Sequence, residues 1–214
     1  MKTATGSRVD KGEAILAAAL IVFGRDGFTD GNVDEIARNA GVAKPTVYNR
    51  FGDKQALFTA AVKHGSQQAN ERVLGVIASL DLTPTDLRAE LERLGRALVD
   101  CVSHAHGAAL MRLQFAERAR FPELLDGIRD SNRARTIDAL AGKLAQLSMS
   151  GYLRLRDAPR AARQFMSLVT DDALSASGFG GRTLGESELD QPVKDGVDTF
   201  LAAFGPRESD VGSR

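Results

Sequence analysis

The stretch NVDEIARNAGVAKPTVYNRF, residues 32–51, is the part of the chain that decides the fold. Asn32, followed by Glu35 three positions later, predicts a capping-box-like start for a short helix over about 33–40. Gly41 ends that helix. Pro45 falls in the first turn of a second short helix over 44–50, where its missing N–H costs little. Two short helices joined by a tight glycine turn are typical of a helix-turn-helix.

The two short helices have an apolar side and a polar side. The apolar residues, which can pack inward onto the preceding helix, are Ile36, Ala37, Val42, Val47 and Phe51. The outward residues are of kinds that contact phosphates and base edges in a major groove; they are Lys44, Thr46, Tyr48 and Asn49. The same pattern also fits a helical hairpin with solvated lysines, so the pattern alone leaves both interpretations open.

The charge of the whole chain gives no support for a nucleic-acid partner. Its 28 Lys and Arg balance 28 Asp and Glu, so there is no domain-wide basic excess. The local charge differs. From residue 38 to residue 54 the basic residues are Arg38, Lys44, Arg50 and Lys54, and the only acid is Asp53. This stretch therefore carries a net charge of +3 and forms a small basic face.

Helical periodicity continues on both sides of this stretch. Ile15, Ala19, Val22 and Phe23 recur at helical spacing and predict a helix over about 9–26, with Gly27 as its cap. Asp53 predicts the start of a long helix that runs to about residue 80. No stretch alternates as a strand would, so the expected fold class is all-α.

The C-terminal part is also expected to be helical, with helices over 84–103, 106–120, 122–151, 159–178 and 187–205. Pro84, Pro122, Pro159 and Pro192 are each expected near a helix start. The segment 178–187 contains four glycines and is interpreted as a loose linker. Residues 1–8 and 206–214 are expected to be flexible tails.

Composition excludes several classes of protein. With 43% hydrophobic and 26% charged residues, the 214-residue chain has an ordinary globular composition. Its single cysteine, Cys101, can form neither an intramolecular disulfide nor a zinc ribbon, which suits a reducing compartment. The longest strongly apolar run, 15–23, is too short to span a membrane. The expected location is the cytoplasm.

The order GRDGF followed by NVDEIARNAGVAKPTVYNRFGDKQALF resembles the N-terminal DNA-binding domain of the TetR family of bacterial transcriptional regulators. The pattern of that family is matched at Ile36, Ala37, Ala40, Gly41, Val42, Thr46, Tyr48, Phe51, Lys54 and Leu57. The chain departs from it at Asn32, Ala43, Arg50 and Gly52. Asn32 can still cap its helix, whereas Arg50 in place of the frequent histidine bears on operator choice or backbone contact.

The resemblance implies a helix-turn-helix domain over 9–53 and a helical domain for effector binding and dimerisation over 54–205. It identifies the helix from Lys44 to Arg50 as the recognition helix. The residues implied to contact double-stranded DNA are Asn32, Lys44, Pro45, Thr46, Tyr48, Asn49 and Lys54.

The stretch FAERARFPELLDGI and the later APRAARQFMSLVTDD resemble the C-terminal domain of AefR-like TetR regulators. That resemblance implies a homodimer in which the last two helices pair with their copies in a second subunit. Two recognition helices about 34 Å apart would then read a pseudo-palindromic operator. The implied interface residues are Phe165, Val169, Ala173, Ala176, Ser177, Val197, Leu201 and Phe204. The alternative is that these stripes close the core of a single chain.

The family also implies a repressor that a small-molecule effector releases from DNA. Candidate residues for the effector pocket are Met111, Gln114, Phe115, Asn132, Met149, Phe165 and Met166. Each of them also fits a place in the ordinary core.

The sequence shows no pattern typical of an enzyme. Cys101, His104 and His106 are the only cluster of reactive types, and their spacing does not place three ligands on one helix face. No catalytic residue, metal or cofactor is therefore expected. The competing hypothesis is a helical small-molecule-binding protein or enzyme that does not bind DNA.

Overall fold

The computed structural model describes residues 11–182 and 184–206. Over these residues all regular structure is helical. The helices are α1 (Lys11–Asp30), α2 (Val33–Asn39), α3 (Lys44–Phe51), α4 (Lys54–Ala78), α5 (Leu87–Ser103), α6 (Ala105–Glu117), α7 (Pro122–Met149), α8 (Ala158–Ala176) and α9 (Glu186–Phe204). The all-α prediction is confirmed. Of the predicted tails 1–8 and 206–214, all residues except 206 lie outside the described residues.

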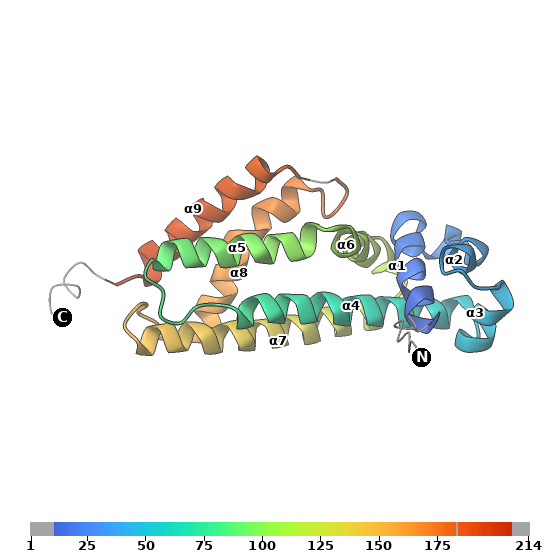
Figure 1. Ribbon diagram of the computed structural model, residues 1–214, viewed down its shortest axis with the longest axis horizontal. Helices are drawn as coiled ribbons and strands as arrows, with labels where there is room; N and C mark the ends of the chain where they lie inside the picture. Colours follow the sequence, from blue (N-terminus) through green and yellow to red (C-terminus); the bar gives the residue numbers. More distant parts are fainter. Residues whose placement is uncertain (1–10, 183, 207–214) are drawn as a thin grey trace, which may run out of the picture.

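The molecule is elongated, with α1, α2 and α3 at one end (Figure 1). Ile15, Val22 and Phe23 of α1 are fully buried, as are Ile36 of α2 and Phe58 of α4. These side chains form a core that also takes in Leu110, Leu113 and Leu125 from α6 and α7. The three-helix end therefore shares its core with the rest of the chain.

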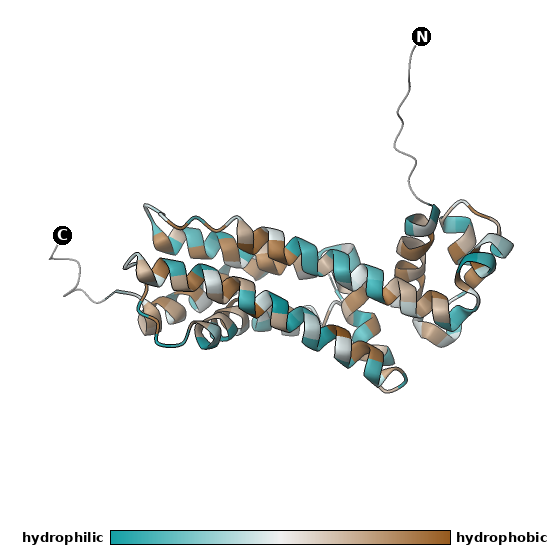
Figure 2. Ribbon diagram, turned by 90° about the horizontal axis from the view of Figure 1, so that it is seen from below, coloured by the Kyte–Doolittle hydropathy of each residue, from teal (hydrophilic) through white to brown (hydrophobic). Residues whose placement is uncertain are grey.

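The body is built on two long helices, α4 and α7, which run side by side along it (Figure 1). Helices α5 and α8 pack on this pair, and α9 packs on α5 and α8. Together they bury a second core, whose largest fully buried side chains include Leu91, Leu94, Phe165 and Phe200. Hydrophilic residues are interspersed with hydrophobic ones along the long helices (Figure 2). Among the described helices none is long and apolar enough to span a bilayer.

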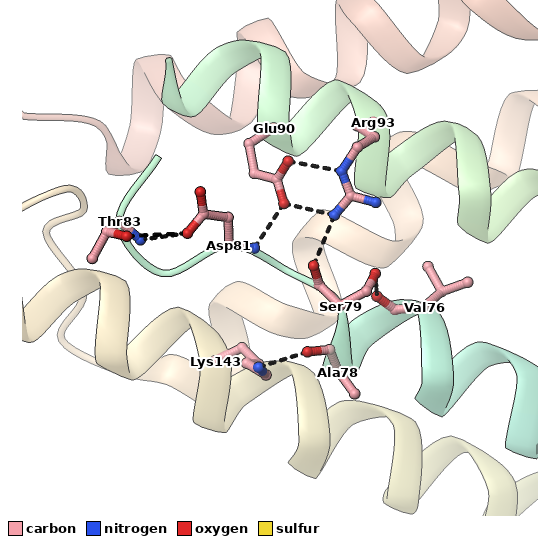
Figure 3. Close-up of polar contacts among 8 residues, drawn as sticks. All are labelled: Val76, Ala78, Ser79, Asp81, Thr83, Glu90, Arg93 and Lys143. Atoms are coloured by element: carbon pink, nitrogen blue, oxygen red, sulfur yellow. Dashed lines mark hydrogen bonds and ion pairs between the residues drawn. The ribbon is translucent and has the colours of Figure 1, made fainter. Parts of the chain in front are cut away.

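The end of α4 far from α3 is fastened to its neighbours by polar contacts (Figure 3). The Arg93 guanidinium of α5 donates to the Glu90 carboxylate and, at 3.1 Å, to the Ser79 carbonyl just after α4. Lys143 of α7 donates to the Ala78 carbonyl at 2.8 Å. The hydrogen bonds from Arg93 hold the pKa of the Glu90 carboxyl below its usual value. These contacts fix one end of a helix whose other end begins beside α3.

Helix ends follow the sequence signals at most positions. The Asn32 and Asp53 side chains accept hydrogen bonds from the N–H groups of Asp34 (2.8 Å) and Ala56 (2.7 Å), as N-caps do. Gly41 has a φ of 66°, which suits glycine at the turn.

Two local expectations about helix starts are corrected. Glu35 does not complete a capping box, because its carboxylate instead accepts two hydrogen bonds from Arg25. Pro192 lies inside α9 and not near its start, because α9 already begins at Glu186.

Candidate nucleic-acid interface and effector cavity

Helix α3 presents a polar, solvent-exposed face at one end of the molecule. Of its eight residues only Val47 is buried, and that side chain holds α3 on the shared core. The side chains of Lys44, Pro45, Thr46, Tyr48 and Asn49 are all exposed, Tyr48 to 38%. No hydrogen bond from the described residues engages the side chains of Thr46, Tyr48 or Asn49. The face is therefore open to an external partner.

The two lysines that are expected to contact DNA, Lys44 and Lys54, each have a partner within the chain. Lys44 donates to the Asp34 carboxylate of α2 at 2.9 Å, and this hydrogen bond raises the pKa of the Lys44 ammonium. Lys54 donates to the Thr29 carbonyl at 2.9 Å. An ammonium has three N–H donors, so both lysines keep donors for an anion such as a phosphate.

Arg50, which departs from the family pattern, lies against the first turn of α1. A Cβ placed on Gly12 would come within 2.2 Å of the Arg50 guanidinium. The absence of a side chain at Gly12 thus gives Arg50 room to pack across α1. This contact positions the C-terminal end of α3 relative to α1.

The body contains a cavity of about 370 Å³ between α4, α7 and the helices that pack on them. This volume falls in the range of sites for small organic molecules. Its lining comprises Ala69, Asn70, Val73, Cys101, Gly107, Leu110, Met111, Gln114, Arg129, Asn132, Arg133, Thr136, Ile137, Arg163, Met166, Ser167, Thr170 and Asp171.

Four of the seven residues expected in an effector pocket line this cavity: Met111, Gln114, Asn132 and Met166. The other three do not. Phe115 is 60% exposed and Met149 is 88% exposed, so both point to solvent, whereas Phe165 is fully buried in the core of the body. Asn70 and Thr136 also line the cavity and were not expected there from the sequence; they are polar residues on the buried faces of α4 and α7. A polar residue within an apolar helical stripe is the signal that could have found them.

The stripes expected to form a dimer interface are instead covered mainly within the single chain. Phe165, Val169, Ala173, Ser177 and Val197 are buried by the protein's own helices and offer no area to a second subunit. Phe165 and Phe200 meet edge to face at 5.1 Å between ring centroids. Of the expected residues, Ala176 is exposed, and Leu201 and Phe204 are partly buried.

Helix α6 joins the cavity to the three-helix end. Its residues Gly107, Leu110, Met111 and Gln114 line the cavity. The same helix carries Arg112, whose guanidinium donates to the Gly24 carbonyl of α1 at 3.1 Å and to the Gly180 carbonyl in the connection between α8 and α9. A shift of α6 would therefore act on α1 directly.

A second contact between α6 and α1 lies at the point where α1 bends. Gly27 has a φ of 74°, and the next N–H, of Phe28, donates to the largely buried Glu117 carboxylate at 2.7 Å. The Phe28 ring packs edge to face on Phe121 at 5.1 Å, and the Arg120 guanidinium lies 4.5 Å from the Phe28 ring centroid. These contacts were not expected from the sequence, because they join residues about 90 positions apart.

Two members of the cysteine and histidine cluster, Cys101 and His104, have places in the fold that need no reactive chemistry. His104 caps α6, its Nδ1 accepting from the Gly107 N–H at 3.1 Å, and burial lowers the pKa of its imidazole. Cys101 lines the cavity, and burial raises the pKa of its thiol, which opposes thiolate chemistry. Within 11–182 and 184–206, no group of three or more His, Cys, Asp or Glu could hold a metal ion.

An exposed polar helix that follows a glycine turn, in a chain whose body holds a cavity, is typical of a helix-turn-helix regulator. The matches to known protein families agree with this class of protein. Residues 15–61 match the family of bacterial regulatory proteins of the tetR type, and residues 89–206 match the C-terminal domain of AefR-like transcriptional repressors. The second match alone covers more than half of the chain. The protein belongs to the TetR family of transcriptional regulators, which bind DNA and are not enzymes.

Two solved structures share this architecture, and a further regulator is similar in sequence over part of its length. A TetR-family regulator of known structure from Mesorhizobium loti is 26% identical, with a TM-score of 0.82 over 94% of this chain and all of that chain. The flavonoid-responsive regulator FrrA is 29% identical, with a TM-score of 0.64 over 92% of this chain and 98% of that one. The transcriptional activator FasR of Mycolicibacterium smegmatis is 34% identical over 46% of this chain and 45% of its own length.

Proposed function

We propose that this protein is a repressor that binds a pseudo-palindromic operator as a homodimer and is released when a small organic effector enters the cavity of the body. In this proposal residues 9–53 bind DNA, and residues 54–205 bind the effector and form the dimer. Residues 9, 10 and 183 lie outside the described part. A regulator of this kind acts in the cytoplasm, where its DNA is.

The observation that carries this proposal is the double role of α6. One part of its surface lines the cavity, and another holds α1 through Arg112 and Glu117. Because the far end of α4 is fastened by Arg93 and Lys143, a displacement caused in the cavity is directed toward α1 and the nearby end of α4. Such a coupling is typically about 1–3 kcal/mol.

At the DNA end, the exposed residues Lys44, Pro45, Thr46, Tyr48 and Asn49 are proposed to enter the major groove. Asn32 and Lys54 are proposed to contact phosphates at the flanks. The dimer is proposed to form through the outward faces of α8 and α9, with Ala176, Leu201 and Phe204 as the remaining candidates. The description of the matched C-terminal domain supports repression, whereas the relative FasR is an activator.

Selection of bound DNA from a random library tests the DNA-binding step, because it reports the operator and its symmetry together. The selected DNA should be pseudo-palindromic and should shift in mobility with the wild type. Lys54→Gln should weaken binding to all sequences alike and flatten its salt dependence, because it removes a positive charge at a proposed phosphate contact. Tyr48→Ala should weaken binding without flattening the salt dependence, and Arg160→Gln, an exposed change at the start of α8, should do neither.

Light scattering on the eluting protein should give the mass of a dimer. Recovery of no specific DNA would overturn the proposal in favour of a small-molecule-binding protein that does not bind DNA.

Transcription of a reporter gene placed behind the selected operator distinguishes repression from activation. Repression predicts higher expression in the absence of the protein.

A further inference from the structure

From the lining of the cavity we infer that the effector is an organic anion with an aliphatic body and an oxygen acceptor within that body. This inference rests on the proposed function only where it calls the ligand an effector, that is, a molecule that releases the protein from DNA. Whether the cavity binds such a molecule does not depend on DNA binding.

The body of the ligand follows from the apolar lining. The apolar side chains are Ala69, Val73, Leu110, Met111, Ile137 and Met166, and none of the described residues that line the cavity is aromatic. Aliphatic and thioether side chains adapt to a flexible chain, whereas a flat ring system gains most from aromatic neighbours on which it can stack. The cavity therefore favours an aliphatic chain over a planar aromatic molecule.

The oxygen acceptor follows from Asn70, which is only 4% exposed. Its Oδ1 accepts from the Thr136 hydroxyl at 3.2 Å, but its buried Nδ2 has no hydrogen-bond partner. A buried donor without a partner costs about 1–3 kcal/mol, which a ligand oxygen would recover. Because Asn70 lines the cavity, this amide marks the place for a carbonyl or ether oxygen.

The negative charge follows from the exposed residues of the lining, which form the mouth of the cavity: Arg129, Arg133, Arg163, Ser167 and Asp171. Arg129 is already paired with Asp126 and Asp130. Arg133 of α7 and Arg163 of α8 have no ion-pair or hydrogen-bond partner among the described residues. These two unpaired guanidinium groups outnumber Asp171, the one carboxylate among the described residues of the mouth. The mouth therefore favours a ligand whose polar end is an anion, such as a carboxylate.

Calorimetric titration of the full chain with probes of one chain length tests the charge. Decanoate should bind at least about tenfold more tightly than decan-1-ol, and decyltrimethylammonium should bind more weakly than both. Replacing both Arg133→Gln and Arg163→Gln should remove the preference for decanoate and leave decan-1-ol binding unchanged. Arg160→Gln, which lies outside the cavity, should preserve the preference.

The acceptor is tested by comparing 5-oxodecanoate with decanoate. The keto acid should bind more tightly to the wild type, and Asn70→Leu should abolish that advantage. Equal binding of the two acids to the wild type would overturn the role of Asn70. Tighter binding of decan-1-ol, of the cation or of the flavonoid naringenin, or no binding of any probe, would overturn the whole inference.

Mobility shift with the selected DNA separates this inference from the proposed function. If decanoate binds with the expected preference but leaves the DNA complex unchanged, the release mechanism is wrong and the ligand class stands. If specific DNA binding is found while decanoate shows no preference over the alcohol, the regulator stands and the ligand class is wrong.

Discussion

Helix α3 and the α8–α9 pair have similar sequence patterns, since each helix has one apolar and one polar side. The two regions differ in how much of the apolar side is buried and in how open the polar side is. Helix α3 buries a single side chain, Val47, and leaves its polar face open. Helices α8 and α9 bury their apolar stripes, with Phe165, Val197 and Phe200 fully covered. An apolar stripe thus shows that a face is covered and does not show by which chain. The following substitutions test this difference, from the largest expected effect on folding to the smallest.

Phe165→Ala should give the largest loss. Removing a fully buried aromatic side chain leaves a cavity beside Phe200 and costs about 3–5 kcal/mol of the free energy of unfolding. Urea denaturation measures this. Phe115→Ala, at a residue that is 60% exposed, is the matched control and should cost about 1 kcal/mol or less. If light scattering instead shows that Phe165→Ala dissociates a dimer and leaves a stable monomer, the stripe faces a partner.

Glu117→Ala should have an intermediate effect at the junction between the two regions. It leaves the Phe28 N–H without its acceptor and should cost about 1–3 kcal/mol. The exchange rate of the Phe28 amide, measured by NMR, should rise. Glu117→Gln keeps an oxygen acceptor and should restore most of the protection. Equal losses in the two variants would mean that the negative charge, and not the hydrogen bond, holds α1.

Combining Thr46→Ala with Asn49→Ala should change the free energy of unfolding by less than about 0.5 kcal/mol, because both side chains are exposed. The same variant should lose about 1–3 kcal/mol of operator affinity for each lost base contact. Thermal unfolding and mobility shift on one preparation measure the two quantities. A large loss of stability would contradict the view that this face is open for a partner.

The smallest effect is expected for the exposed ion pair between Arg182, which precedes α9, and Glu188 in the first turn of α9. Hydrogen bonds from Arg182 and from the Gly185 N–H lower the pKa of the Glu188 carboxyl to about 2. Because this pKa lies below that of the unfolded chain, the stabilisation is present above about pH 4.5 and is lost as the pH falls toward 2. Unfolding midpoints of wild type and Glu188→Gln should converge over this window. A difference that persists at pH 2 would show that the charge is not its source.

Much of the fold could be predicted from the sequence because its signals are local. Asn32 and Asp53 cap their helices as expected, and the exposed face of α3 follows from the spacing of its polar residues. The cavity of the body was predicted only in part. Met111, Gln114, Asn132 and Met166 line it, but Phe115 and Met149 face solvent. Periodicity places a residue on a face and carries no information about which helix covers that face.

The sequence alone determined the class of fold, the helix boundaries to within a few residues and the TetR-type helix-turn-helix, because hydrogen bonds and caps within a helix involve residues only a few positions apart. Only the tertiary structure decided that Phe165 and Val197 close the core of one chain, that Asn70 and Thr136 meet at the cavity, and that Glu117 holds the bend of α1. These pairings join distant segments through packing, which depends on how the helices fill space together.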